Sequence, residues 1–133
     1  MASAIDAAAL DQIFRTARTQ NKWQAKDVPD SLLKDLVDLM KMGPTSANCQ
    51  PARIVFVKSA TAKERLAPFL SEGNRAKTMT APVCATIGFD LEFFENLPRV
   101  FPHNQSAKSW FTSSPAHAET TAFRNGTLQG AYF

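Results

Sequence analysis

An abrupt change of pattern at Gly43-Pro44 constrains the fold more than any other feature of the sequence. Before it, apolar residues recur at the spacing of one helix face: Leu33, Leu36, Val37 and Met40. Asp30 or Ser31 is the expected cap of this helix, which should end at Gly43-Pro44 because glycine permits a left-handed cap and proline cannot continue the helix. After it, the unbroken apolar run of residues 54–57 predicts a buried strand. The sequence therefore predicts a helix and a strand joined by a polar loop.

The loop carries short polar side chains between two prolines, which restrict its backbone. Hydroxyl and amide groups occur close together in it, on Thr45, Ser46, Asn48 and Gln50. Such a set suits a neutral heterocycle with many hydrogen-bonding edges better than a metal ion or a bare phosphate. The alternative is an ordinary turn whose Thr, Ser and Asn side chains cap the backbone.

Similar patterns predict the other elements. A first amphipathic helix should start at a cap on Asp6, and a further helix should start at the capping box of Thr61 and Glu64. Residues 71–74 have the composition of a turn, and residues 83–89 that of a second strand. A last helix is expected from Ser114-Pro115 onward. Its small residues recur every four positions and would let another helix approach closely: Ala118, Ala122, Gly126 and Gly130.

Composition narrows the class of protein. The chain of 133 residues is 44% hydrophobic and 20% charged, which predicts one globular domain over residues 1–133. The net charge of +3 comes from scattered Lys and Arg, so no nucleic-acid partner is expected. Two cysteines and two histidines without ligand spacing predict neither a disulfide framework nor a metal site. No signal peptide and no membrane-spanning run is recognised, so we expect a cytoplasmic protein without membrane contact.

The string GPTSANCQPARIVFV at residues 43–57 resembles the nitroreductase family of FMN-dependent oxidoreductases. The resemblance extends over most of the chain, through Lys63-Glu64-Arg65-Leu66, Gly73-Asn74 with Lys77-Thr78, and residues 81–83, 109–115 and 121–125. It is strongest for the branch described as malonic semialdehyde reductase, 3-hydroxypropanoate dehydrogenase or NADH dehydrogenase/NAD(P)H nitroreductase. It implies an α/β (α+β) nitroreductase-like fold with a central sheet flanked by helices. It also implies that the chain stops after the family's central helix, so that the C-terminal part of the fold is absent.

The resemblance implies a set of cofactor-binding residues: Arg18, Thr19, Gln20, Lys22, Pro44, Thr45, Ser46, Asn48, Asn74 and Lys77. Arg18 to Lys22 would hold the phosphate and ribityl chain of FMN, although the family usually has Ser where Gln20 stands. The loop residues would face the flavin of a partner subunit, which implies a homodimer. Asn74 and Lys77 would contact the edge of the flavin ring. From spacing alone, Arg18 and Lys22 share a helix face if that turn is helical, where they either grip a phosphate or remain solvated.

The implied activity is hydride transfer from NADH or NADPH through FMN to an electron-poor acceptor such as a nitroaromatic, a quinone or a small semialdehyde. No catalytic acid or base is expected from the protein, because the flavin carries the bond chemistry. The alternative is a non-catalytic fragment that associates through its small-residue helix without binding flavin.

Overall fold

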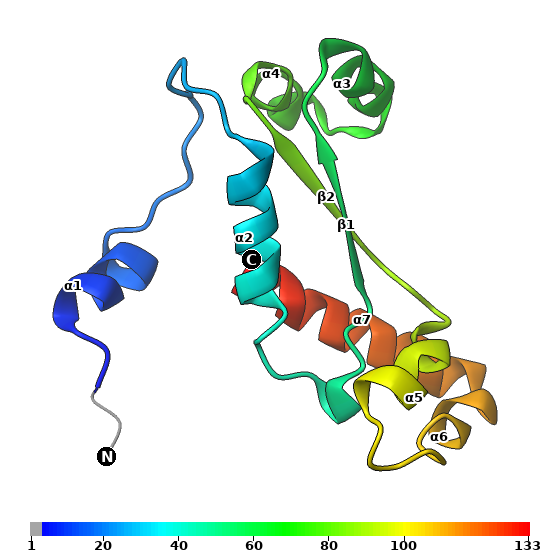
Figure 1. The fold of residues 1–133 in the computed structure, drawn as a ribbon. Helices are drawn as coiled ribbons and strands as arrows, with labels where there is room; N and C mark the ends of the chain where they lie inside the picture. The colour runs from blue at the N-terminus through cyan, green and yellow to red at the C-terminus, as the bar shows by residue number, and fades with distance from the viewer. Residues whose placement is uncertain (1–3) are drawn as a thin grey trace.

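The computed structural model describes residues 4–133, in which helices lie at both ends and along one side of a two-stranded antiparallel sheet (Figure 1). In chain order the elements are α1 (Ala7–Leu10), a π-helical turn (Asp11–Arg15), α2 (Asp30–Met40), a 3-10 turn (Ser46–Asn48), β1 (Ala52–Val57), α3 (Ala60–Leu66), a 3-10 turn (Ala67–Phe69), α4 (Glu72–Thr80), β2 (Cys84–Phe89), a 3-10 turn (Phe93–Asn96), α5 (Leu97–Val100), α6 (Ser109–Thr112) and α7 (Pro115–Tyr132).

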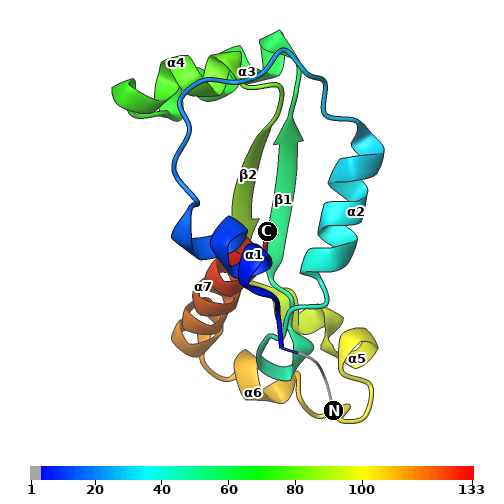
Figure 2. The same cartoon turned by 90° about the vertical axis from the view of Figure 1, so that its left-hand side faces the viewer.

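The two strands form a ribbon with different helices at its two ends. Ala52 pairs with Phe89 at one end of the ribbon, and Val57 pairs with Cys84 at the other. α3 and α4 lie at the Val57 end, whereas α5, α6 and α7 lie toward the Ala52 end (Figures 1 and 2). The polar loop therefore enters the ribbon at the end remote from α4.

α2 forms where the leucine pattern predicts it, but its termini differ from the expectation. Pro29 is the N-cap, with φ −69° and ψ 150°, and no side chain caps the helix, so the predicted cap at Asp30 or Ser31 was wrong. Gly43 does not adopt a positive φ. Glycine is required there for another reason, because a Cβ at this position would lie 2.3 Å from the ring of Tyr132.

α3 and α4 also correct the predicted boundaries. The N-cap of α3 is Ser59, whose hydroxyl accepts a hydrogen bond from the backbone of Ala62. The predicted cap at Thr61 was therefore wrong by two residues. Residues 71–74, predicted as a turn, instead open α4, which begins at Glu72.

The strands are less buried than their apolar sequences suggest. Val55 is 60% exposed, and β2 is exposed from Thr86 to Phe89, so the prediction of a fully buried first strand was wrong. Within residues 4–133 the sheet has only these two strands, which leaves both outer edges unpaired.

The small-residue stripe of α7 packs against the sheet. A Cβ added at Gly126 would lie 3.0 Å from Phe89 Cβ, and one added at Gly130 would lie 3.5 Å from Ile87. The expectation of a helix against the stripe is therefore wrong for these two glycines, which pack against β2. Ala118 and Ala122, the other two residues of the stripe, lie in the buried cluster that α5 and α6 contribute to.

The core lies where α5, α6 and α7 meet the loop. Phe93, Leu97 and Phe111 are nearly inaccessible and surround the thiol of Cys49. Trp110, next to Phe111 in the sequence, is not part of this core and is 47% exposed.

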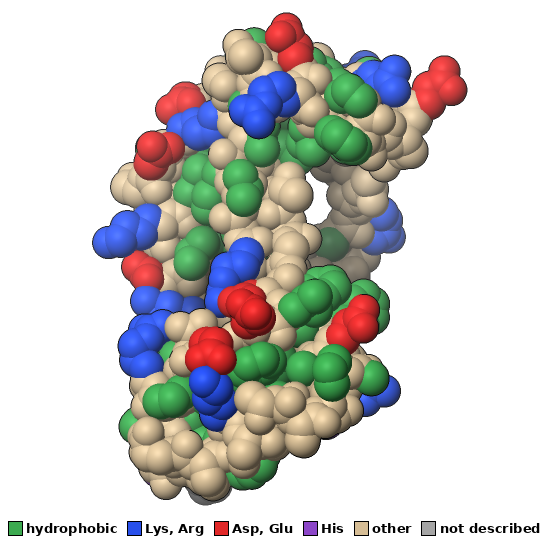
Figure 3. All heavy atoms as spheres, turned by 90° about the vertical axis from the view of Figure 1, so that its right-hand side faces the viewer, with side chains coloured by type: hydrophobic (Ala, Val, Ile, Leu, Met, Phe, Trp, Pro, Cys, Tyr) green, Lys and Arg blue, Asp and Glu red, His purple; other side chains and the backbone are tan. Residues whose placement is uncertain are grey.

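The N-terminal segment packs loosely. Asp6 caps α1 as predicted, accepting a hydrogen bond from Ala9 at 2.7 Å, yet Ile13 and Phe14 of the following turn are 56% and 70% exposed. Residues 17–24 are not helical, so the condition under which Arg18 and Lys22 would share a helix face is not met. The segment climbs past β2, crosses the end where α3 and α4 lie, and descends into α2 (Figure 2). The space-filling view shows an opening through the upper half of the molecule (Figure 3).

Candidate functional site

A pocket of about 380 Å³ forms where the N-terminal segment meets α4 and the start of β2. The segment supplies Thr19, Gln20 and Trp23, and α4 supplies Lys77. The floor is small and apolar: Ala81, Val83, Cys84 and Ala85. The volume falls in the range of small-molecule sites.

Two hydrogen bonds fix the segment to α4. The indole Nε1 of Trp23 donates to the backbone carbonyl of Lys77 at 2.7 Å. The ammonium of Lys77 in turn donates to Asn21 Oδ1 at 3.4 Å. Thr19, Gln20 and Lys77, which come from distant parts of the sequence, are thereby brought to one place.

The remaining predicted residues of this group lie around the pocket without lining it. Arg18 donates to the backbone carbonyls of Arg15 at 3.1 Å and Ala17 at 2.6 Å. Lys22 and Asn74 are exposed. All three residues are exposed, so their side chains are accessible to a ligand.

The polar loop is held by one face of α7. Asn125 Oδ1 accepts a hydrogen bond from the backbone N–H of Ser46 at 2.8 Å, and Gln129 Oε1 accepts one from Ala52 at 2.9 Å. Tyr132 donates its hydroxyl to the carbonyl of Pro44 at 2.9 Å. These contacts join residues 77 to 88 positions apart in the sequence.

The loop has an uncommon backbone. Ala47, Asn48 and Gln50 have φ values of 50°, 49° and 41°, in the left-handed region that residues with a Cβ seldom adopt. Such conformations persist only where surrounding contacts over-determine them. The contacts from α7 fulfil that condition here.

Most polar side chains of the loop already have partners within the chain. Thr45 Oγ1 accepts from the backbone of Gln50 at 3.3 Å. Asn48 donates to the carbonyl of Val100 at 2.8 Å and accepts from the amide of Gln50 at 2.6 Å. The exposed hydroxyl of Ser46, in contrast, has no hydrogen-bond partner in residues 4–133.

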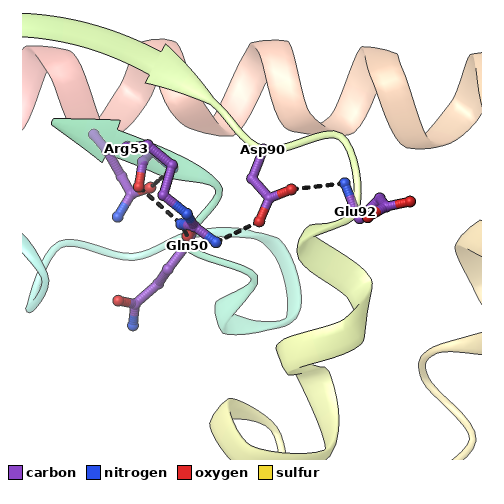
Figure 4. Close-up of polar contacts among 6 residues, drawn as sticks. Gln50, Arg53, Asp90 and Glu92 are labelled. Carbon is purple, nitrogen blue, oxygen red and sulfur yellow. Dashed lines mark hydrogen bonds and ion pairs between the residues drawn. The ribbon is translucent and has the colours of Figure 1, made fainter. Parts of the chain in front are cut away.

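An ion pair fixes the start of β1 beside the loop (Figure 4). Arg53 lies 2.5 Å from Asp90 and also donates to the carbonyl of Gln50 at 3.1 Å. The other oxygen of Asp90 accepts from the backbone of Glu92 at 2.8 Å. The pair therefore connects the end of the loop with the chain that leaves β2.

The pocket and the loop lie at opposite ends of the ribbon. The pocket includes Cys84 and Ala85, whereas the loop runs into Ala52 opposite Phe89. At about 3.4 Å per residue, the strand between them spans about 17 Å. The two groups of predicted residues therefore lie apart within residues 4–133.

Sequence reasoning missed the residues that assemble both groups. Trp23 and Asn21 tie the segment to α4, and Asn125, Gln129 and Tyr132 hold the loop. The last three occur at i, i+4 and i+7 on a helix face otherwise made of small residues, and that polar pattern was the available signal. A larger hollow of about 670 Å³ between α2, β1 and α3 contains none of the predicted residues.

Comparison with known proteins identifies the family of this chain. The chain belongs to the nitroreductase family, whose model matches residues 4–120. A relative from Burkholderia lata, named "Putative NADH dehydrogenase/NAD(P)H nitroreductase", is 63% identical over 124 residues, which are 93% of this chain and 63% of that protein. A relative of the same name from Stenotrophomonas maltophilia strain K279a is 61% identical over 132 residues, which are 99% of this chain and 67% of that protein.

Solved structures agree on the fold. A crystal structure described as a "putative nitroreductase in complex with FMN", from Exiguobacterium sibiricum, superposes with a TM-score of 0.79 at 15% identity, covering 98% of this chain and 69% of that one. The predicted nitroreductase-like fold is confirmed. The chain spans about two thirds of the length of these relatives. None of the helices within residues 4–133 is both long and apolar enough to cross a membrane.

Proposed function

We propose that this protein is an FMN-dependent oxidoreductase that uses NADH or NADPH as its electron donor. The observation that carries the proposal is the pocket that brings Thr19, Gln20 and Lys77 together in a chain of the nitroreductase family. The names of the relatives, which refer to NAD(P)H, and the neighbour crystallised with FMN support the choice of cofactors.

The donor set of this region suits FMN. A phosphate needs cations, and Arg18 and Lys22 lie on the segment that borders the pocket. A hydroxyl and an amide, on Thr19 and Gln20, suit the hydroxyls of a ribityl chain. To bind a phosphate, Arg18 has to exchange its present backbone carbonyl partners for the ligand.

Lys77 has the central electrostatic role in this proposal. When bound, FMN supplies the redox chemistry, taking up hydride and passing it on. A fixed ammonium at the ring edge favours the negative charge that accompanies flavin reduction. The bond from Trp23 to the carbonyl of Lys77 holds the helical turn that presents this ammonium. Asn74, one turn earlier on α4, would add a neutral donor.

We further propose a homodimer in which the loop of one protomer faces the pocket of its partner. The separation of about 17 Å along the ribbon supports an arrangement in trans. Phe123 and Leu128 of α7 are 57% and 45% exposed, an apolar surface suited to contact with a second copy. Pro44, Thr45, Ser46 and Asn48 would then approach the flavin from across the interface.

The acceptor in this proposal is a small electron-poor molecule. Nitroaromatics, quinones and small semialdehydes share that property, and malonic semialdehyde is the candidate that the resemblance of the sequence indicates. The nicotinamide donor and the two free thiols fit a reducing compartment, so we place the activity in the cytoplasm.

The visible absorption spectrum tests the proposal. Purified protein mixed with FMN should retain the yellow flavin through gel filtration, and its bands should bleach anaerobically on addition of NADH or NADPH. Protein that remains colourless at high FMN concentration would contradict the proposal. Riboflavin, which lacks the phosphate, is the control ligand: it should bind more weakly than FMN, and Arg18→Ala should reduce that preference.

A further inference from the structure

Three side chains spaced along one face of α7 make direct hydrogen bonds to the polar loop. They reach its beginning at Pro44, its middle at Ser46 and its end at Ala52. The contacts are therefore spread along the whole loop and hold it at three points. A rigid helix is a better frame for positioning a loop than another loop would be.

The orientation of the central residue is fixed. Asn125 Nδ2 donates to the carbonyl of Thr121 at 2.9 Å, so its Oδ1 is directed toward the N–H of Ser46. Asn125 is 7% exposed and Gln129 is 2% exposed. Water therefore does not readily replace either acceptor, and a loop N–H that loses one of them is left unsatisfied.

The loop depends on this support. Its left-handed residues Ala47, Asn48 and Gln50 are not glycines, so the conformation is unfavourable in isolation. The side chains of Thr45 and Asn48 are engaged within the chain, whereas the exposed hydroxyl of Ser46 has no partner in residues 4–133 and is open to a ligand.

We propose that Asn125, Gln129 and Tyr132 are positioning residues, which hold loop residues 43–52 in the conformation that directs the Ser46 hydroxyl to the flavin of the partner protomer. This inference rests on the proposed function, and it assigns to the buried polar face of α7 a role in cofactor recognition. Because the residues act through the backbone of the loop, they touch neither flavin nor substrate.

The test uses three variants that remove the hydrogen bond to the loop and keep a side chain of similar shape: Asn125→Leu, Gln129→Met and Tyr132→Phe. Asn125→Leu also removes the hydrogen bond to the carbonyl of Thr121 within α7. Tyr132→Phe retains the ring that covers Gly43 and is the mildest change. The matched control is Leu33→Val, which loosens a buried site on α2 without a hydrogen bond to the loop. Each protein is assayed for the FMN dissociation constant, for the position of the visible flavin bands, and for amide hydrogen exchange over residues 43–52.

The expected result for Asn125→Leu and Gln129→Met is a dissociation constant raised roughly fivefold to tenfold, since one net hydrogen bond has about that effect. The flavin bands should shift and the loop amides should exchange faster, whereas Leu33→Val changes neither. If the wild type binds FMN and the variants bind it equally well, this inference is overturned while the proposed function stands. The same holds if Leu33→Val has an equal effect. Wild-type protein that binds no FMN overturns the proposed function and this inference together.

Discussion

Cys49 is a structural residue, although it stands among the polar residues of the loop. It lies inside the polar loop, yet its side chain is 1% exposed and belongs to the core cluster. Burial raises the pKa of the Cys49 thiol to about 11, although a hydrogen bond with Thr45 opposes the shift. The thiolate is the reactive form, so this thiol is structural at neutral pH.

The raised pKa predicts a loss of stability at alkaline pH. In the unfolded chain the thiol ionises near pH 9.0, whereas in the folded protein it stays protonated to about pH 11. Between these values the unfolded state binds fewer protons, so the free energy of unfolding should fall by up to about 1.4 kcal/mol per pH unit from this group.

Denaturant titrations from pH 8 to 11 measure this slope. Cys49→Ala is the control, because it removes the group while other alkaline titrations remain. A variant with the same slope as the wild type would show that Cys49 does not contribute.

At the scale of elements, α7 organises the molecule. Its two glycines pack against β2, and its polar residues Asn125 and Gln129 hold the loop. One helix thereby sets both the position of the sheet and the shape of the loop. Because these contacts join residues far apart in the sequence, mutations in α7 should affect the loop and β2.

The two glycines of α7 should respond differently to alanine. At Gly130 a new Cβ makes an ordinary contact of 3.5 Å with Ile87, so Gly130→Ala should stabilise the helix by up to about 1 kcal/mol. At Gly126 the new Cβ lies 3.0 Å from Phe89 Cβ, which cannot rotate away, and overpacking of this kind costs about 1–3 kcal/mol.

Chemical denaturation of the two variants tests this difference. Gly126→Ala should be neutral or destabilising, whereas Gly130→Ala should gain stability. Equal gains in both variants would show that β2 yields to a methyl group and that the close approach is not a constraint.

The whole molecule places the predicted residues in two groups rather than one. Trp23 ties the first group to α4 at one end of the ribbon, and α7 fixes the second at the other end. A dimer that pairs the pocket of one protomer with the loop of its partner is the arrangement that our proposed function requires.

Subunit mixing tests this arrangement. Lys77→Ala damages the pocket, and Ser46→Trp blocks the loop, so each variant alone should have little oxidoreductase activity. After denaturation and refolding of an equal mixture, half of the dimers should be mixed, and each mixed dimer has one intact pocket facing one intact loop. Activity should therefore recover to about a quarter of the wild-type value. If the mixture is shown to contain mixed dimers and activity still does not recover, both groups belong to a site within one protomer.

The sequence by itself determined the local elements and the composition of the loop. The apolar spacing of α2, the cap at Asp6, the strand patterns and the polar residues 44–50 were readable because they depend on neighbours a few positions away. The resemblance of the motif at residues 43–57 to the nitroreductase family added the fold, which the comparisons confirm.

Only the tertiary structure decided how these parts are used. The bond from Trp23 to Lys77 spans 54 residues, and those from α7 to the loop span 77 to 88. No local pattern specifies such pairs, because they arise only when the chain folds back on itself and buried polar groups must find partners. For the same reason the sequence predicted a helix against the glycines of α7, where the structure places a strand.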